Sequence, residues 1–253
     1  PAVRWKVKNL VETSSIEKPS LLTKCRRHHL LKVNDIREHF LDELKAERFT
    51  TDRLGSKTIE LIGASFLADE PAIFGEPNEE YIEAELGWYY SQSNNIDDIY
   101  ANLKEPPKAW QYAANAHGEI NSNYGRLIFS DQYYNQYQRC LAELVANRDT
   151  RRACIVYNRP SIWTEYNADG KSDFICTNAV TYYIRGDKLH CCVQMRSNDV
   201  IFGYRNDYAW QKHILGSLVE DFSNKNFDLI EEGDIIWQVQ NLHVYEKHFD
   251  LVQ

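Results

Sequence analysis

Three short segments hold the residues that could do chemistry in this chain. Cys176 stands in SDFICTNAV, Arg196 and Ser197 lie in MRSNDVIFGYRNDYAWQ, and His243 and Tyr245 lie in LHVY. A cysteine becomes a nucleophile when nearby positive charge lowers its thiol pKa, and an arginine can donate two parallel hydrogen bonds to a phosphate. Residues that alternate with apolar neighbours on a strand project to one face. The segments predict a nucleophilic site for a phosphate-bearing substrate, with arginines lowering the thiol pKa.

Together the three segments resemble the nucleotide site of the thymidylate synthase superfamily. There the pattern RS-x-D-x-x-x-G-x-x-x-[ND] follows a nucleophilic cysteine and precedes H-x-Y, as it does here. A lone strand cysteine is most often a core residue, so the order of the segments is what favours a catalytic Cys176. Asp207 stands where a thymidylate synthase carries Asn. In this respect the chain is most similar to the deoxycytidylate hydroxymethylase branch of T-even phages.

The resemblance implies a dCMP 5-hydroxymethyltransferase. In that reaction Cys176 adds to carbon 6 of dCMP, carbon 5 takes a one-carbon unit from the cofactor 5,10-methylenetetrahydrofolate, and water completes the hydroxymethyl group. A dCMP methylase and a dUMP-specific thymidylate synthase remain alternatives, because the residues do not decide between water and hydride. The alternative of another class is a non-catalytic homologue that binds nucleic acid through the basic tract from Lys24 to His29.

Asp207 is the residue that we expect to distinguish the bases. A carboxamide complements the ring N–H and carbonyl of uracil, whereas cytosine presents a bare ring nitrogen beside an amino group. A carboxyl group can accept from that amino group and, when protonated, donate to the ring nitrogen. Since Asp207 precedes an apolar helical stretch, a helix N-cap is the simpler structural interpretation.

Further residues match the family's substrate site. The matched positions are Arg53, Arg151, Arg152, Arg196, Ser197, Asp199, His243 and Tyr245. Arg53 lies in DRLG, similar to the family's D-R-T-G loop. The resemblance implies that Arg151 and Arg152 reach into the site of a second subunit, so that a homodimer shares its active sites.

Glu85 is expected to do acid–base work. It lies in ELGWY, which resembles the family's E-L-x-W-F helix, although a glutamate on a surface helix is ordinarily solvated. The positions that match the family's folate side are Trp110, Tyr124, Asp199 and Gly203. No H-E-x-x-H pattern is present, and no metal is expected.

Composition limits the classes of protein that fit. Of the 253 residues 43% are hydrophobic, and no apolar run is long enough to span a membrane. A net charge of −8 gives no general attraction for polyanions, so nucleic acid is not an expected partner. Six cysteines without a secretory leader predict a reduced cytoplasmic setting. The resemblance suggests the host cytoplasm of a phage, and a phage deoxynucleotide-synthesis complex as a further partner.

Periodicity and turn signals predict an α+β fold, with a mixed sheet packed against helices. The resemblance adds a homodimer formed through the sheet. We expect an irregular extension over residues 1–30 and a single domain over residues 31–253. The predicted helices begin at Asn34 and Asn78, run from Asp131 to Ala146, and follow Asp207 to Phe222. The predicted strands are Lys57 to Phe66, Phe174 to Ile184, Lys188 to Met195 and Asp234 to Val239. The turn signal Arg185-Gly186-Asp187 predicts that the second and third of these strands form a hairpin.

Overall fold

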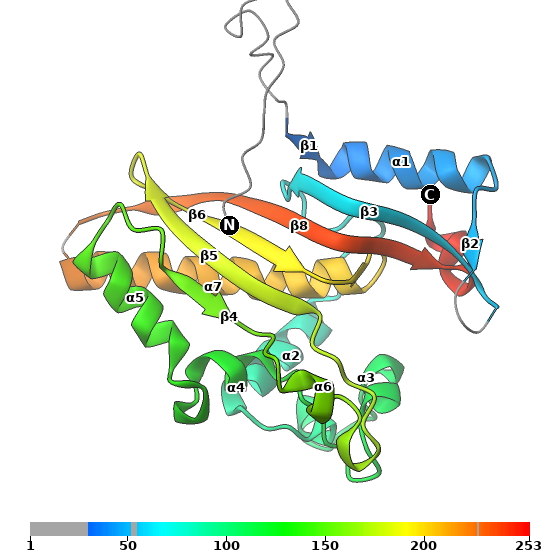
Figure 1. The fold of residues 1–253 in the computed structure, drawn as a ribbon, viewed down its shortest axis with the longest axis horizontal. Helices are drawn as coiled ribbons and strands as arrows, with labels where there is room; N and C mark the ends of the chain where they lie inside the picture. The colour runs from blue at the N-terminus through cyan, green and yellow to red at the C-terminus, as the bar shows by residue number, and fades with distance from the viewer. Residues whose placement is uncertain (1–29, 52–54, 227) are drawn as a thin grey trace, which may run out of the picture.

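The computed structural model describes residues 30–51, 55–226 and 228–253, and it forms a mixed sheet packed with helices. The strands are β1 (Leu31–Lys32), β2 (Thr50–Thr51), β3 (Lys57–Leu67), β4 (Cys154–Val156), β5 (Thr177–Arg185), β6 (Lys188–Met195), β7 (Asn198–Asp199) and β8 (Glu231–Tyr245). Their order in the sheet is β1-β3-β8-β6-β5-β4, with β2 beside β3 and β7 beside β8 (Figure 1). The predicted α+β class is therefore confirmed.

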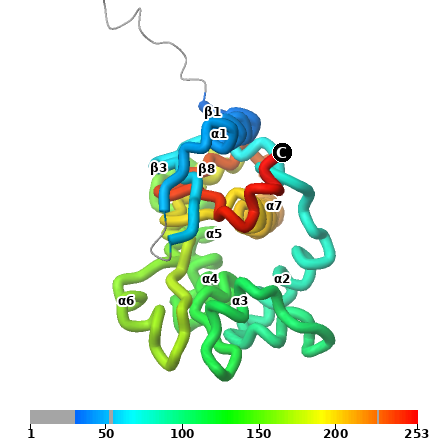
Figure 2. Tube along the Cα trace, turned by 90° about the vertical axis from the view of Figure 1, so that its right-hand side faces the viewer, coloured from blue at the N-terminus to red at the C-terminus, as the bar shows by residue number. Residues whose placement is uncertain are grey.

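Helices lie on both sides of this sheet. The α-helices are α1 (Val33–Lys45), α2 (Glu79–Ser91), α3 (Lys108–Ala113), α4 (Tyr124–Phe129), α5 (Gln136–Ala146), α6 (Ile162–Glu165) and α7 (Gly203–Asn226). Short 3₁₀ helices are η1 (Ile96–Tyr100), η2 (Asp131–Tyr133), η3 (Ala168–Gly170) and η4 (Glu246–Leu251). Figure 2 shows α1 above the sheet, α7 beneath it, and α2, α3 and α4 in a further layer below. This third layer delivers Glu85, Trp110 and Tyr124.

The pairing of the strands explains how α7 comes to lie under the sheet. β5 and β6 form an antiparallel hairpin, whose turn residues Gly186 and Asp187 both have positive φ. This confirms the predicted hairpin. β6 and β8 are parallel neighbours, and parallel strands need a crossover connection. The crossover is α7, so the polar segment between β6 and α7 must pass the carboxyl end of β6.

Several predicted boundaries were wrong. α1 begins at Val33 and is capped through Asp35, which accepts from the Lys32 amide at 2.7 Å, so Asn34 is not its N-cap. The helix predicted from Asp131 begins only at Gln136, because Tyr134 and Asn135 have positive φ and interrupt it. β8 is longer at both ends than the predicted strand. Asn78 caps α2 as predicted, accepting from the Tyr81 amide at 3.1 Å.

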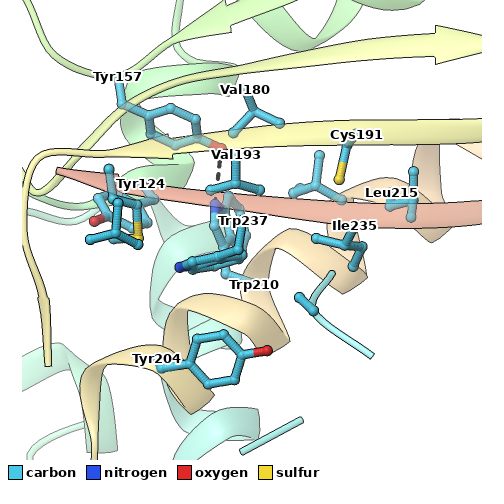
Figure 3. Packing of buried hydrophobic residues seen from close by; sticks show 14 of the residues in the cluster. Tyr124, Tyr157, Val180, Cys191, Val193, Tyr204, Trp210, Leu215, Ile235 and Trp237 are labelled. Atoms are coloured by element: carbon cyan, nitrogen blue, oxygen red, sulfur yellow. Dashed lines mark hydrogen bonds between the residues drawn. The ribbon is translucent and has the colours of Figure 1, made fainter. Parts of the chain in front are cut away.

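Aromatic side chains fill the core between the sheet and α7 (Figure 3). Trp210 of α7 is 1% exposed and donates its indole N–H to the Tyr157 hydroxyl at 3.0 Å. Trp237 of β8 is fully buried and donates to Asn198 Oδ1 at 3.2 Å. A buried tryptophan contributes a large apolar area, and its indole N–H usually finds a hydrogen-bond partner. These two bonds fix α7 and the segment after β6 against the strands.

The close approach of α4 to α2 generates a stability prediction. A Cβ at Gly125 would lie 1.8 Å from the Tyr89 carbonyl oxygen, a backbone atom of α2. We expect Gly125→Ala to lower the free energy of unfolding by about 1–3 kcal/mol, as overpacking does, because α4 must move away from α2. Denaturant unfolding measures this difference.

Gly87→Ala on α2 is the matched control. A Cβ there meets no atom within 4 Å, so the exchange should stabilise the helix by up to about 1 kcal/mol. Equal effects at the two glycines would contradict the close packing of α2 and α4.

Candidate active site

Cys176 lies just before β5 and is half-buried between the buried residues Ile175 and Thr177. The sequence predicted that Cys176 belongs to this strand. That prediction was wrong, because regular pairing begins at Thr177 and is interrupted by a bulge directly after it. The Arg196 backbone N–H donates to the Cys176 carbonyl at 2.9 Å. The sulfur is thus held at the irregular end of β5, beside the segment that follows β6.

The Arg196 side chain contacts residues 174–176. Its Nη2 lies 3.4 Å from Cys176 Sγ, its Nε donates to the Ile175 carbonyl at 2.9 Å, and its Nη2 also donates to the Phe174 carbonyl. The guanidinium stacks over the Phe174 ring, 4.8 Å from the ring centroid. Arg196 therefore reaches the sulfur, as expected for a residue at this site. Ser197 follows it and is half-buried.

The thiol pKa is opposite to the predicted direction. Burial raises the pKa of Cys176 to about 11, and the carboxyls of Asp207 and Asp173 raise it further, while Arg196 acts against them. Withdrawal from water destabilises a thiolate, and one guanidinium does not compensate for it. Arg196 thus lowers the thiol pKa as predicted, but burial outweighs it, so the net shift is upward.

Asp207 lies inside α7, at the second turn, so it is not a helix cap. Asp199 lies before the helix, and its Oδ1 accepts from the amides of Ile201 at 2.8 Å and Phe202 at 3.3 Å in the turn that leads into α7. The predicted start of this helix after Asp207 was wrong, because α7 begins at Gly203. The simpler structural interpretation of Asp207 is thereby removed.

The Asp207 carboxyl group has a pKa well above its ordinary value. Burial and the nearby charge of Glu85 raise its pKa to about 8, while hydrogen bonds from Asn198 and Tyr124 act in the opposite direction. Asn198 Nδ2 donates to Asp207 Oδ2 at 2.8 Å. A protonated carboxyl group can both accept and donate, which is what recognition of cytosine requires.

Asn198 is a functional residue that the sequence analysis missed. Its amide oxygen accepts from Trp237 and its amide nitrogen donates to Asp207, so both ends are fixed. A Cβ at Gly203 would lie 3.1 Å from Asn198 Nδ2, so glycine is needed for this close approach. Asn198 and Gly203 both lie in the motif. Only the fold shows that Asn198 orients Asp207 and that Gly203 leaves room for the Asn198 amide.

Glu85 is buried, with 5% of its surface exposed. Burial raises its carboxyl pKa to about 7, opposed by hydrogen bonds from Tyr81, Trp110 and Tyr89. The Trp110 indole N–H lies 3.2 Å from Glu85 Oε1. A carboxyl with a pKa near neutrality can take up and release a proton at working pH, so this environment suits the expected acid–base work.

Tyr124 interacts with Asp207 and with the residues at Cys176. It is 4% exposed, its ring stacks on Tyr89 at 5.4 Å, and its hydroxyl accepts from Thr177 Oγ1 at 3.0 Å. It also hydrogen-bonds Asp207 and lies within electrostatic reach of Cys176. The structure thus brings residues from α2, α4, α7 and the start of β5 into one site.

His243 and Tyr245 lie on β8 beside this site. Their rings are in edge contact at 4.8 Å, as expected for residues that share a strand face. His243 pairs with Asp199 in the register of β7 and β8, and its carbonyl accepts from the Val200 amide at 2.9 Å. Burial lowers the His243 pKa, so its imidazole is neutral at pH 7. A neutral imidazole offers one donor and one acceptor.

Two of the predicted arginines do not reach the site of their own chain. Arg151 and Arg152 are exposed just before β4, and Arg152 pairs with Glu143 at 3.0 Å. β4 is antiparallel to β5, with Cys154 opposite Thr181, so the arginines lie toward the end of β5 that is remote from Cys176. Arg53 and the basic tract from Lys24 to His29 lie outside the described residues.

The described residues show neither a metal-binding cluster nor a membrane-spanning helix. Within residues 30–51, 55–226 and 228–253, no group of His, Cys, Asp and Glu side chains is arranged to hold a metal ion. No helix in the same part of the chain is long and apolar enough to cross a membrane.

The raised carboxyl pKa values generate a prediction about stability and pH. Asp207 and Glu85 have ordinary pKa values of 3.8 and 4.5, against about 8 and about 7 in the fold. Between these limits the folded chain holds protons that the unfolded chain has lost, so the free energy of unfolding falls as pH rises. The stabilisation is complete below the ordinary values and lost above the folded ones.

We therefore expect the neutral Asp207→Asn variant to gain stability relative to the parent as pH rises from about 5 to about 8.5. Glu85→Gln should behave in the same way, over a window that ends about one unit lower. Denaturant unfolding at each pH measures the difference. A gap between variant and parent that does not change with pH would contradict the assignment.

Comparison with known proteins agrees with this geometry. The thymidylate synthase family model matches residues 45–253. Deoxycytidylate 5-hydroxymethyltransferase of Enterobacteria phage T4 is 53% identical over 223 residues, covering 88% of this chain and 89% of the phage protein. The protein of the same name from phage T6 shows the same identity and coverage.

More distant relatives carry the same family name. Thymidylate synthase of Fusobacterium nucleatum is 27% identical over 169 residues, covering 66% of this chain and 56% of that protein. The solved thermostable thymidylate synthase A from Bacillus subtilis has a TM-score of 0.61 at 18% identity, covering 87% of this chain and 82% of its own. With a family match over most of its length and phage relatives at 53% identity, the chain belongs to the thymidylate synthase family.

Proposed function

We propose that this protein is a dCMP 5-hydroxymethyltransferase, a one-carbon transferase that acts on a pyrimidine deoxynucleotide. The observation that carries the proposal is the Asp207 carboxyl group, which accepts from Asn198 Nδ2 at 2.8 Å and lies within electrostatic reach of Cys176. Burial raises the pKa of this carboxyl group to about 8, so that its protonated form is available near neutral pH. Its hydroxyl can donate to the bare ring nitrogen of cytosine, and its other oxygen can accept from the amino group. The phage relatives named for this activity support the same conclusion.

Covalent chemistry on the pyrimidine begins at Cys176. Its thiolate sulfur bonds to carbon 6, and the electron pair of the ring double bond moves to carbon 5, which becomes a nucleophile. After carbon 5 has taken up the one-carbon unit it loses its proton, and the bond between that unit and the nitrogen of its carrier breaks, with the electron pair and a proton going to the nitrogen. Water then adds its oxygen to the exocyclic carbon, and the bond between sulfur and carbon 6 breaks to restore the double bond.

Proton transfers fall to Glu85. With a carboxyl pKa of about 7, Glu85 is ionised in part of the molecules and protonated in the rest at neutral pH. The ionised form can accept a proton from water or from carbon 5, and the protonated form can return one. Arg196 positions the cysteine and leaves its positive charge beside the sulfur. His243 and Tyr245, on β8, offer polar groups for a sugar hydroxyl.

The residues present fit 5,10-methylenetetrahydrofolate. Trp110 offers a half-buried aromatic surface for a flat ring, and Asp199 offers carboxylate acceptor capacity beyond the Oδ1 that accepts from Ile201 and Phe202. Tyr124 is deeply buried beside Asp207, which places it nearer the base than the outer part of a folate. When bound, the folate supplies a one-carbon unit to carbon 5. Trp110, Asp199 and Gly203 would hold it.

A homodimer would complete the site. The sheet face turned away from α7 carries half-exposed and mixed side chains, among them Thr181, Tyr183, Cys192 and Gln238, with Val156 49% exposed. A second copy packed there could form a two-fold interface. Arg151 and Arg152 of the partner subunit would then supply the phosphate contacts that these exposed residues do not make in their own chain.

Product mass tests the proposed function. The protein incubated with dCMP and 5,10-methylenetetrahydrofolate should give a product heavier than dCMP by one CH₂O unit. Cys176→Ser should lower turnover by more than about 10³-fold while nucleotide binding persists. A gain of CH₂ would instead identify a methylase, and turnover of dUMP alone would identify a thymidylate synthase. A salt-sensitive gel shift without turnover would indicate a nucleic-acid-binding homologue.

Asp207→Asn tests the basis of recognition. It exchanges a carboxyl that matches cytosine for a carboxamide that matches uracil, at nearly constant volume. We expect the ratio of kcat/KM for dCMP over dUMP to fall by about 10²-fold or more, because paired polar groups become mispaired. Asp221→Asn on the same helix, where the carboxyl accepts from Tyr137 at 2.7 Å, is the matched control. An unchanged ratio for Asp207→Asn would remove the main reason for preferring dCMP.

Mixed dimers test the shared site. Arg151→Ala/Arg152→Ala subunits and Cys176→Ser subunits should each be inactive alone. When they are mixed, one hybrid site combines an intact Cys176 with the intact arginines of the partner subunit, so activity should return to about a quarter of the parent level in a random mixture of symmetric dimers. Verified heterodimers without activity would argue against the shared site.

A further inference from the structure

Tyr81 lies one helical turn before Glu85 on α2, and Tyr89 lies one turn after it. Residues spaced by four share a helix face, so the three side chains point into the site together. The Tyr81 hydroxyl donates to Glu85 Oε1. The Trp110 indole N–H lies 2.8 Å from the Tyr81 oxygen and 3.2 Å from Glu85 Oε1. Tyr81, Trp110 and Glu85 thus form a closed triangle of hydrogen bonds.

We propose that Tyr81 is the positioning residue that orients the Glu85 carboxyl group for proton transfer in this reaction. The proposal rests on the acid–base role given to Glu85 in the proposed function. Tyr81 was not predicted as a site residue, because a tyrosine on an amphipathic helix is ordinarily a core residue. The helical spacing to Glu85 is the signal that could have found it.

The triangle fixes the direction of the Tyr81 hydroxyl. A phenol has one proton to donate, and an indole N–H can only donate. Since Trp110 donates to the Tyr81 oxygen, the Tyr81 proton points to Glu85 Oε1. The ring itself is 9% exposed and packs against the ring of Tyr100 at 6.3 Å, so the hydroxyl cannot swing away freely. Glu85 Oε1 receives two converging donors, which defines the orientation of the carboxyl plane.

The same bond tunes the charge of Glu85. The titratable groups that face this carboxyl are Tyr81 and Tyr89 from α2 and Asp207 from α7. Burial raises the Glu85 pKa, and the donors Tyr81, Trp110 and Tyr89 lower it again, in that order. Hydrogen bonds to a charged acceptor are the strong ones. Loss of the Tyr81 hydroxyl therefore removes the largest stabilisation of the carboxylate and must raise its pKa.

Tyr81→Phe tests the proposal, because it removes one oxygen and leaves the ring in place. We expect kcat to fall by about tenfold or more. The limb of the pH profile that Glu85 governs should move to higher pH, whichever protonation state the reaction needs. The dissociation constant for dCMP should stay within about twofold of the parent value. Tyr100→Phe, the same change in the adjacent ring, should leave both kcat and the pH profile unchanged.

Trp110→Phe provides a second variant in case Tyr81→Phe folds poorly. It removes the other donor to Glu85 Oε1 and should move the same limb in the same direction. The proposal is overturned if the pH limb moves in neither variant. This holds whether kcat is preserved or falls equally at every pH, because an equal fall is what a merely structural role of Tyr81 predicts. Glu85→Gln distinguishes a failure of the positioning role of Tyr81 from a failure of the acid–base role of Glu85. Full turnover by that variant would contradict the acid–base role of Glu85 itself.

Discussion

The burial of two carboxyl groups within electrostatic reach of each other sets the conditions for the whole site. Asp207 and Glu85 cannot both carry charge without a large penalty, because burial and mutual repulsion disfavour the second ionisation. The fold surrounds them unequally. Glu85 receives hydrogen bonds from Tyr81, Trp110 and Tyr89, whereas Asp207 receives them from Asn198 and Tyr124. The Glu85 carboxyl therefore has the lower pKa of the two, and the proposed recognition of cytosine uses the proton that Asp207 retains.

This inequality depends on where α7 begins. If the helix began after Asp207, the carboxylate would accept backbone N–H groups at the helix N-terminus, and these would stabilise its charge. The helix instead begins at Gly203, so Asp207 lies in the second turn and faces Asn198. The parallel pairing of β6 with β8 requires the crossover that carries this helix beneath the sheet. In the proposed function, base recognition therefore depends on strand order as well as on the residue at position 207.

Much of the site could be read from the sequence, because its residues stand in short segments of fixed order. The α+β class, the β5–β6 hairpin and the cap of α2 also followed from local patterns. The environment of each group did not. The two bonds of Asn198, the triangle around Tyr81 and the burial of Glu85 join residues far apart in the chain. The predicted start of α7 was wrong because an aspartate before an apolar helical stretch is typical of a helix cap, and only the path of the chain after β6 shows that the helix has already begun at Gly203.

The pKa of the Cys176 thiol shows how little positive charge the described part of the chain places beside the sulfur. A pKa of about 11 leaves almost no thiolate at neutral pH. In the described part of the chain Arg196 is the cation that lowers it, and much of its hydrogen-bonding capacity is taken by the carbonyls of Phe174 and Ile175. In the proposed dimer, further positive charge comes from Arg151 and Arg152 of the partner subunit. Assembly would then do more than complete phosphate binding, because it would supply charge that favours the thiolate.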